Sequence, residues 1–180
     1  SNGSLDSSFQ IASTDQAGYN VRLNADGKIF LTGFFTSFNN QPRGGIVQLN
    51  SDGTLDSSFN GSVSNVGILS RTIQQPNGKI LIAGLFSSAN GILSRNLARF
   101  NADGTLDSNF SVGSGTGPSA NIGNSIEALA VQTDGKILIG GDFGSYNGTS
   151  RAHLARLNAD GSLDTAFNPT FISPFFVSII

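Results

Sequence analysis

The carboxylates are the side chains of this 180-residue chain best suited to acid–base chemistry, and most of them recur at fixed places. An enzyme uses one acid and one base in one matched environment, so carboxylates that repeat identically indicate a scaffold. We expect the aspartates before phenylalanine to accept backbone N–H groups near the turn, and the repeated lysines to pair with a neighbouring carboxylate. The repeated residues are Asp6, Asp56, Asp107 and Asp164 before a phenylalanine; Asp52, Asp103 and Asp160 in Asp-Gly turns; Asp26 and Asp134 before Gly-Lys; and Lys28, Lys79 and Lys136.

Three acids fall outside the motifs and are the remaining candidates for catalysis. Glu127 and Asp142 lie on predicted adjacent strands of one unit and could flank a glycosidic bond as a carboxylate pair. The third acid is Asp15, and the single histidine, His153, aligns with Asn96 and Gly45 at a position that we expect to be exposed. No nucleophile elbow accompanies them, and we assign no catalytic residue.

Calcium is the one metal for which the sequence pattern offers candidate ligands. Three Asn-x-Asp-Gly-x-x-Asp segments present oxygen ligands with a spacing that suits a hard cation, but they lack the distal glutamate of a calcium loop. Asn and Asp also form turns without any metal, so we expect no cofactor and keep calcium as the alternative. The candidate ligands are Asn50, Asp52 and Asp56; Asn101, Asp103 and Asp107; and Asn158, Asp160 and Asp164.

Arginines and one loop are the candidates for contact with a ligand. We expect the arginines to pair with aspartates between units, and the alternative is a row of arginines that binds an acidic glycan. In the loop after Phe143, Tyr146, Asn147 and Arg151 are candidate ligand contacts. The arginines concerned are Arg43, Arg95, Arg99, Arg151 and Arg156.

Two motifs divide the chain into repeated units. Leu-Asp-x-x-Phe occurs four times, with steps of 50, 51 and 57 residues between its aspartates, and [Asp/Asn]-Gly-Lys-Ile occurs three times. The units are approximately 10–59, 60–110 and 111–167, with 1–9 ending a preceding unit and 168–180 forming the first strand of a following one. The extra length of the third unit predicts a surface loop over 111–124.

Each unit has the pattern of short strands. Runs such as Ile80–Phe86 and Ile137–Phe143 are apolar and bounded by turn residues, which favours strands. Ile126–Gln132 precedes the second run, and Leu154–Asn158 follows it. An Asn-x-Asp-Gly turn, closed by a left-handed glycine, then leads into Leu-Asp-x-x-Phe as a fourth strand. Four short antiparallel strands in units of 50–57 residues predict an all-β chain of β-propeller blades.

The third unit resembles the delta-60 repeat of bacteria. The resemblance rests on residues 132–143, on Asn147-Gly148 and on residues 151–164, and Gly-Gly after an apolar strand is also similar to kelch blades, which have a comparable period. Delta-60 repeats are expected to form β-propellers in large secreted or surface proteins and have no defined activity. The first unit departs most, because Gly44–Gln48 replaces the Leu-Ala-Arg strand.

Composition excludes several classes of protein. Only 12% of residues are charged, cysteine is absent and the net charge is −2. These values argue against nucleic-acid binding, disulfides and thiolate metal sites, and no apolar run is long enough for membrane insertion. Three blades do not close a ring, so we expect other blades of a longer chain, or alternatively a homo-oligomer of two copies.

These observations together predict a non-catalytic structural or recognition module. We expect it in a secreted or cell-surface bacterial protein or an external virion component, in contact with a protein or glycan surface. The alternatives are a propeller hydrolase or lyase acting on glycans, with acids partly outside this segment, and a calcium-stabilised structural repeat.

Overall fold

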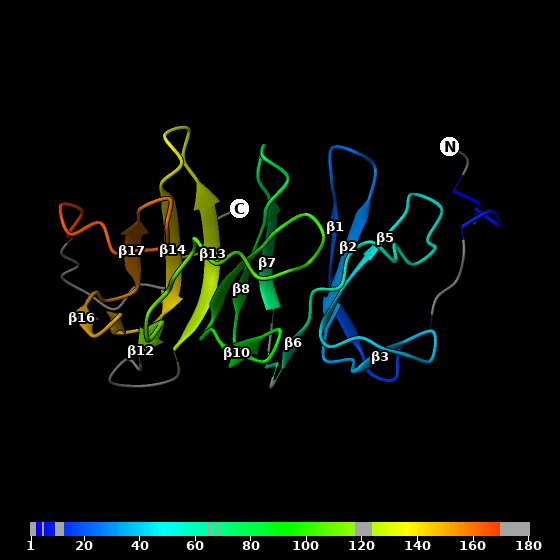
Figure 1. Cartoon of the computed structure of the whole chain (residues 1–180), viewed down its shortest axis with the longest axis horizontal. Helices are drawn as coiled ribbons and strands as arrows, with labels where there is room; N and C mark the ends of the chain where they lie inside the picture. The colour runs from blue at the N-terminus through cyan, green and yellow to red at the C-terminus, as the bar shows by residue number, and fades with distance from the viewer. Residues whose placement is uncertain are drawn as a thin grey trace.

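The computed structural model describes residues 3–4, 6–9, 13–64, 66–67, 69–117 and 124–169, and its regular elements are all strands (Figure 1). No helix in this part of the chain is long and apolar enough to cross a membrane. The predicted first strand of a following unit, 168–180, lies outside the described residues except for its first two. Three units stand side by side along the long axis of the molecule (Figure 1).

Each unit builds a main antiparallel sheet in which the second strand is central. The three sheets are β1 (Gly18–Leu23), β2 (Ile29–Gly33) and β5 (Ile46–Leu49); β7 (Leu69–Gln74), β8 (Ile80–Gly84) and β11 (Leu97–Phe100); and β13 (Ser125–Val131), β14 (Ile137–Asp142) and β17 (Leu154–Leu157). The all-β blade pattern is therefore as predicted.

The predicted fourth strand of each unit is reduced to a single bridge. Leu55 pairs with Leu49, and the bridges Phe100–Leu106 and Leu157–Leu163 repeat the arrangement. The chain turns away at once because the aspartate that follows accepts a hydrogen bond from the N–H two residues on, as Asp56 Oδ1 does from Ser58 at 2.9 Å. Each blade is thus three strands and a bridge.

Short two-residue strands form a second layer that the sequence analysis did not predict. They lie at the lower end of the blades in Figure 1, opposite the Gly-Lys turns. β12 falls in the segment predicted as a surface loop, and its Thr116 is buried. The short strands are β3 (Ser37–Phe38), β4 (Gln41–Pro42), β6 (Val63–Ser64), β9 (Ser88–Ala89), β10 (Ile92–Leu93), β12 (Thr116–Gly117), β15 (Ser145–Tyr146) and β16 (Thr149–Ser150).

The hydrophobic core lies between neighbouring units. β7 packs between β1 and β13, and apolar side chains from facing sheets fill the two contacts. The phenylalanines of the Leu-Asp-x-x-Phe motif contribute at Phe59 and Phe110, which are buried. Phe9 at the equivalent motif position is exposed, and among the described residues no second unit covers it.

A backbone latch joins each unit to the next. The N–H of Asn60 donates to Asp103 O at 3.0 Å, and the N–H of Ser111 donates to Asp160 O at 2.9 Å. The acceptors lie in the Asp-Gly turns, whose glycines have the predicted left-handed backbone, with φ of 82° at Gly104. A Cβ at Gly104 would overlap the backbone of Asn60 and Gly61, so the turn needs glycine for its conformation and for this close approach.

Candidate functional site

The repeated lysines and aspartates form ion pairs within each unit, as predicted. Lys28 Nζ lies 2.6 Å from Asp56 Oδ2. The same pair recurs at 2.8 Å between Lys79 and Asp107 and at 2.7 Å between Lys136 and Asp164. The other oxygen of each carboxylate accepts a backbone N–H two residues on. These carboxylates brace the end of the sheet.

Two arginines add a second cation to this arrangement. Arg99 Nε lies 2.7 Å from Asp107 Oδ2, and Arg156 Nε lies 2.9 Å from Asp164 Oδ2. Each guanidinium also covers the ring of the phenylalanine that ends its own unit, at 4.4 and 4.6 Å from the ring centroid. The pairing is therefore within units, and our expectation of pairs between units was wrong. The Arg99 Nη1 bond to Ala159 O, at 2.6 Å, does cross to the next unit.

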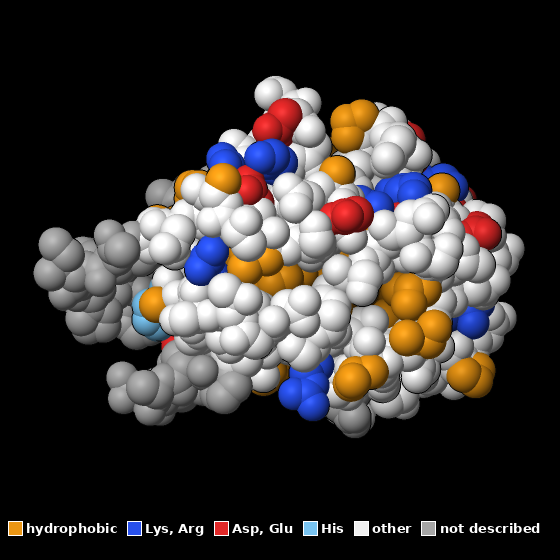
Figure 2. Space-filling view, turned by 60° about the vertical axis from the view of Figure 1, so that its left-hand side comes forward, with side chains coloured by type: hydrophobic (Ala, Val, Ile, Leu, Met, Phe, Trp, Pro, Cys, Tyr) orange, Lys and Arg blue, Asp and Glu red, His pale blue; other side chains and the backbone are white. Residues whose placement is uncertain are grey.

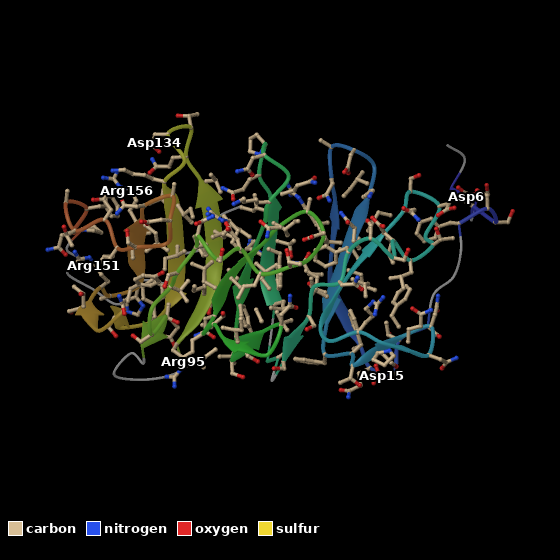
Figure 3. The ribbon with its side chains drawn as sticks, in the orientation of Figure 1. Asp6, Asp15, Arg95, Asp134, Arg151 and Arg156 are labelled. Atoms are coloured by element: carbon tan, nitrogen blue, oxygen red, sulfur yellow. The ribbon has the colours of Figure 1, made fainter. Side chains whose placement is uncertain are left out.

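The other arginines do not join these two in a row. Arg43 Nη1 and Arg151 Nη1 donate to the carbonyl oxygen of the preceding residue, at 2.9 and 2.7 Å. Figure 3 places Arg95 at the lower end of the blades and Arg156 near the upper end. The arginines are thus spread over both ends of the molecule, which contradicts the alternative of a single arginine row for an acidic glycan.

The ion pairs keep these carboxylates ionised. The Lys136 ammonium holds the pKa of Asp164 at about 2. Burial raises the pKa of Asp107, but hydrogen bonds from Lys79 and Arg99 outweigh it, so that pKa lies below its usual value. The same balance, with Lys28 and Ser58 as donors, lowers the pKa of Asp56. A carboxylate of this kind does not hold a proton at neutral pH and is unsuited to act as a general acid.

The candidate calcium ligands have protein partners of their own. In the first unit Asn50 Nδ2 donates to Thr54 Oγ1 at 2.9 Å, the Thr54 N–H donates to Asp52 Oδ1 at 3.0 Å, and Asp56 is paired with Lys28. A cation bound here would have to compete with the lysine. The described residues contain no group of three or more His, Asp or Glu that could hold a metal ion. The other two sets repeat these bonds: Asn101, Asp103 and Asp107; and Asn158, Asp160 and Asp164.

Glu127 and Asp142 lie at the same end of the third sheet. Asp142 is opposite Ser125 in the pairing of β13 with β14, and Glu127 occupies the bulge between Ile126 and Ala128. Ser125 Oγ donates to Glu127 Oε1 at 3.2 Å. The topology thus brings two of the three unrepeated acids, Glu127 and Asp142, to neighbouring positions.

His153 is partly buried and its equivalent in the second unit is buried, so our expectation of an exposed site at this position was wrong. Its equivalent in the second unit, Asn96, is buried and donates through Nδ2 to Thr116 Oγ1 at 2.7 Å and to Asn124 O at 2.6 Å. Both acceptors belong to the third unit. His153 itself is partly buried, and its Nδ1 lies 3.1 Å from Gly141 O.

The predicted contact loop is largely a packing element. Tyr146 is 0% exposed and its hydroxyl donates to Gly161 O at 2.7 Å; burial raises the pKa of that hydroxyl. Arg151 is also buried. Asn147 is exposed, but its Oδ1 accepts the N–H of Ser114 at 3.1 Å. Of the three predicted contact residues, Tyr146 and Arg151 are therefore buried and Asn147 is exposed.

Sequence reasoning missed an amide position that recurs in all three units. An amide residue follows the first strand of each unit, three residues before the glycine of the Gly-Lys turn: Asn24, Gln75 and Gln132. In each, one buried side-chain atom has no hydrogen-bond partner: Asn24 Nδ2, Gln75 Oε1 and Gln132 Oε1. The repetition of an amide at this position was visible in the sequence, whereas its unpaired state was not.

The second unit also exposes two apolar side chains at a strand where the other units have polar residues or proline. Ile92 and Leu93 form β10 and are 58% and 61% exposed. The equivalent strands are Gln41–Pro42 and Thr149–Ser150. This exposed pair is a feature of one unit and not of the repeat.

Comparison with known proteins identifies the repeat. A family model described as "Domain of unknown function (DUF5122) beta-propeller" matches residues 21–59, 75–110 and 132–167, once in each unit. This match agrees with the resemblance to the delta-60 repeat. No curated protein and no solved structure matches the chain.

Proposed function

Because the chain belongs to the family described as a domain of unknown function (DUF5122) beta-propeller, we propose that it is a non-catalytic recognition module. Its blades would present contact surfaces to a protein or glycan. We set it in a secreted or cell-surface bacterial protein or on the outside of a virion. The absence of cysteine and the scarcity of charge support this setting; the face in Figure 2 is mostly white, with small orange patches and few charged side chains.

One observation carries the proposal: repeated charged residues pair with one another, whereas the second unit exposes an apolar pair that is not repeated. Asp56, Asp107 and Asp164 are all held by lysines of their own unit. Ile92 and Leu93 are exposed on one blade only. In a repeat protein that binds a ligand, we expect the residues that hold the units together to repeat and the surface residues to vary.

A panel of glycans and surface proteins tests the proposal. Binding is measured on an array of immobilised ligands, and turnover is measured as new reducing ends or new unsaturated sugars. We expect binding without turnover. Turnover that is lost in Glu127→Gln or Asp142→Asn, with unchanged melting temperature, would overturn the non-catalytic assignment in favour of a glycan hydrolase or lyase.

We also propose that a further blade of the same repeat covers the outer face of the first unit. Val21 in β1 is 67% exposed, whereas its equivalents Thr72 and Leu129 are buried against the preceding unit. Likewise Ile80 is buried and its equivalent Ile29 is only partly so. The first unit thus carries apolar side chains where the others have a neighbour.

Light scattering identifies the source of that blade. A mass of twice 18.6 kDa that Val21→Asp reduces to that of the monomer would indicate a second copy. A monomer that binds a hydrophobic dye, with less binding in Val21→Asp, would indicate a neighbouring blade in a longer chain. A monomer whose dye binding does not change in Val21→Asp would contradict the proposal.

A further inference from the structure

Two clefts lie between the units, at the end of the blades where the Gly-Lys turns project. This end is at the top of Figure 1, and Figure 3 marks it with Asp134 at the tip of the β13–β14 turn. The first cleft, between the first and second units, measures about 420 Å³. The second, between the second and third units, measures about 580 Å³. Both fall in the size range of pockets for small ligands.

The unpaired amides line these clefts. Asn24 and Gln75 line the first cleft, and Gln75 and Gln132 line the second. Asn24 and Gln75 are only 8% and 9% exposed, so their unpaired atoms are denied both water and protein partners. A buried polar atom without a partner is unfavourable, and native scaffolds rarely leave one. Its recurrence in three units points to a ligand that supplies the missing bonds.

The first cleft offers both kinds of hydrogen-bonding atom. Asn24 Nδ2 is a donor and Gln75 Oε1 is an acceptor, and neither has a partner. A sugar hydroxyl both donates and accepts, so adjacent hydroxyls satisfy the two together. The terminal torsions of Asn and Gln are broad and soft, so a small rotation of either amide turns its free atom toward a ligand in the cleft.

The second cleft has no charged residue in its lining. Its polar side chains are amides and a hydroxyl, and Ile73, Pro76 and Val131 supply apolar surface. This combination suits a pyranose ring, which has an apolar C–H face and uncharged hydroxyls at its rim. An anionic glycan would require lysine or arginine here. The lining of the second cleft therefore favours an uncharged sugar, and the first cleft has one residue of each charge, Arg22 and Asp26, in its lining.

The two clefts share one wall. Gln74, Gln75 and Pro76 border both of them, so a ligand that crosses the turn of the second unit occupies both. We propose that the two clefts form one binding site for an uncharged oligosaccharide, with hydrogen bonds from its hydroxyls to Asn24, Gln75 and Gln132. This inference rests on the proposed recognition function and names its ligand class and location.

The test uses the whole chain and short neutral oligosaccharides of glucose, mannose, galactose and N-acetylglucosamine, with uronic-acid oligosaccharides beside them. Affinity is measured by calorimetry, and the side-chain amide signals of Asn24, Gln75 and Gln132 are followed by NMR. We expect a neutral oligosaccharide to bind and to shift these signals. Gln75→Leu should weaken binding about tenfold, the loss expected for one hydrogen bond to a buried group.

A matched control separates binding from folding. Gln41→Leu makes the same change on an exposed hairpin at the opposite end of the first unit and should leave affinity unchanged. Gln75→Leu should retain the melting temperature, since it removes an unpaired acceptor. Neutral binding that is equal in Gln75→Leu and in the native chain, or binding of uronic acids only, would overturn this inference and leave the recognition function standing. Binding to no glycan overturns the inference as well, and recognition then depends on the protein ligands of the panel.

Discussion

The two contacts between units cover the same motif phenylalanine with different side chains. Between the first and second units, Phe59 lies edge-to-face against Phe30 and Phe100, with ring centroids 5.4 and 6.1 Å away. Between the second and third units, the equivalent Phe110 is covered by the guanidinium of Arg99. Gln48 stands in the first unit where Arg99 stands in the second.

The difference shows which part of the repeat is required. The phenylalanine that ends the unit is constant, and its cover is either aromatic or cationic. An aromatic cover depends little on pH or salt, whereas Arg99 is tied to Asp107 and therefore to the ionisation of that carboxylate. The molecule thus has one contact that is mainly apolar and one that is partly ionic.

Removal of the phenylalanine ring should have the largest effect. We expect Phe59→Ala to lower the free energy of unfolding by about 3–5 kcal/mol, because the ring is buried and leaves a cavity. Phe110→Ala should cost less, since it loses no aromatic pair. Urea unfolding of both variants measures the difference. An equal or smaller loss for Phe59→Ala would show that the aromatic cluster adds nothing to the contact.

Loss of the shared carboxylate should come next. Asp107→Asn leaves Lys79 and Arg99 without their counter-charge, and we expect a cost of about 2–3 kcal/mol. Asp56→Asn is the matched control; it strands only Lys28, which is more exposed, and should cost about 1 kcal/mol. Parallel urea unfolding in low and high salt checks both values. Equal costs would mean that Arg99 contributes nothing through this pair.

Acid should progressively weaken the ion pairs of Asp107 and Asp164. Because the pKa of Asp164 is lowered to about 2 and that of Asp107 is also lowered, their stabilisation is complete above the ordinary aspartate pKa of about 3.9 and is lost as pH falls through the lower folded value. We expect the free energy of unfolding to decrease between these limits. The decrease should be shallower in Asp164→Asn, and identical pH profiles for this variant and the native chain would rule out Asp164 as a source.

Transfer of the arginine to the first unit should have the smallest effect. Gln48→Arg introduces a guanidinium where Phe30 and Phe100 already flank the ring, so we expect a loss of about 1 kcal/mol from overpacking. Addition of Phe30→Leu, the residue type of the second unit, should restore stability and make the contact sensitive to salt. Thermal unfolding at two salt concentrations measures this. A double variant whose stability does not depend on salt would show that the arginine is not the source of the salt dependence.

Features set by the repeated motifs were predictable from the sequence. The ion pair of Lys79 with Asp107 follows from motifs at constant spacing, and the Asn-x-Asp-Gly turns follow from local backbone preference. The short hairpins also had a signal that we did not use: Asn90-Gly91 and Asn147-Gly148 have positive φ at both residues, as a two-residue hairpin turn requires.

Features set by contacts outside the repeated motifs were not predictable. Tyr146 looked like a loop residue, but it is buried and its hydroxyl donates to the carbonyl of Gly161. Asn96 marked an apparently variable surface position, and it bonds Thr116 and Asn124 of the following unit. Gln75 Oε1 has no hydrogen-bond partner because of the residues that surround it in the folded chain. In each case the deciding partner lies outside the local motif.

The backbone latch has a consequence for how such chains arise. Asn60 and Ser111 hold the next unit through peptide groups alone, and a peptide group is the same whatever the side chain. These two backbone bonds, unlike the side-chain contacts between units, can therefore be kept by units with different sequences, provided that the turn keeps its glycine. Duplication, loss or exchange of a whole blade by recombination would leave the joint intact, and the blades are free to diverge in what they bind.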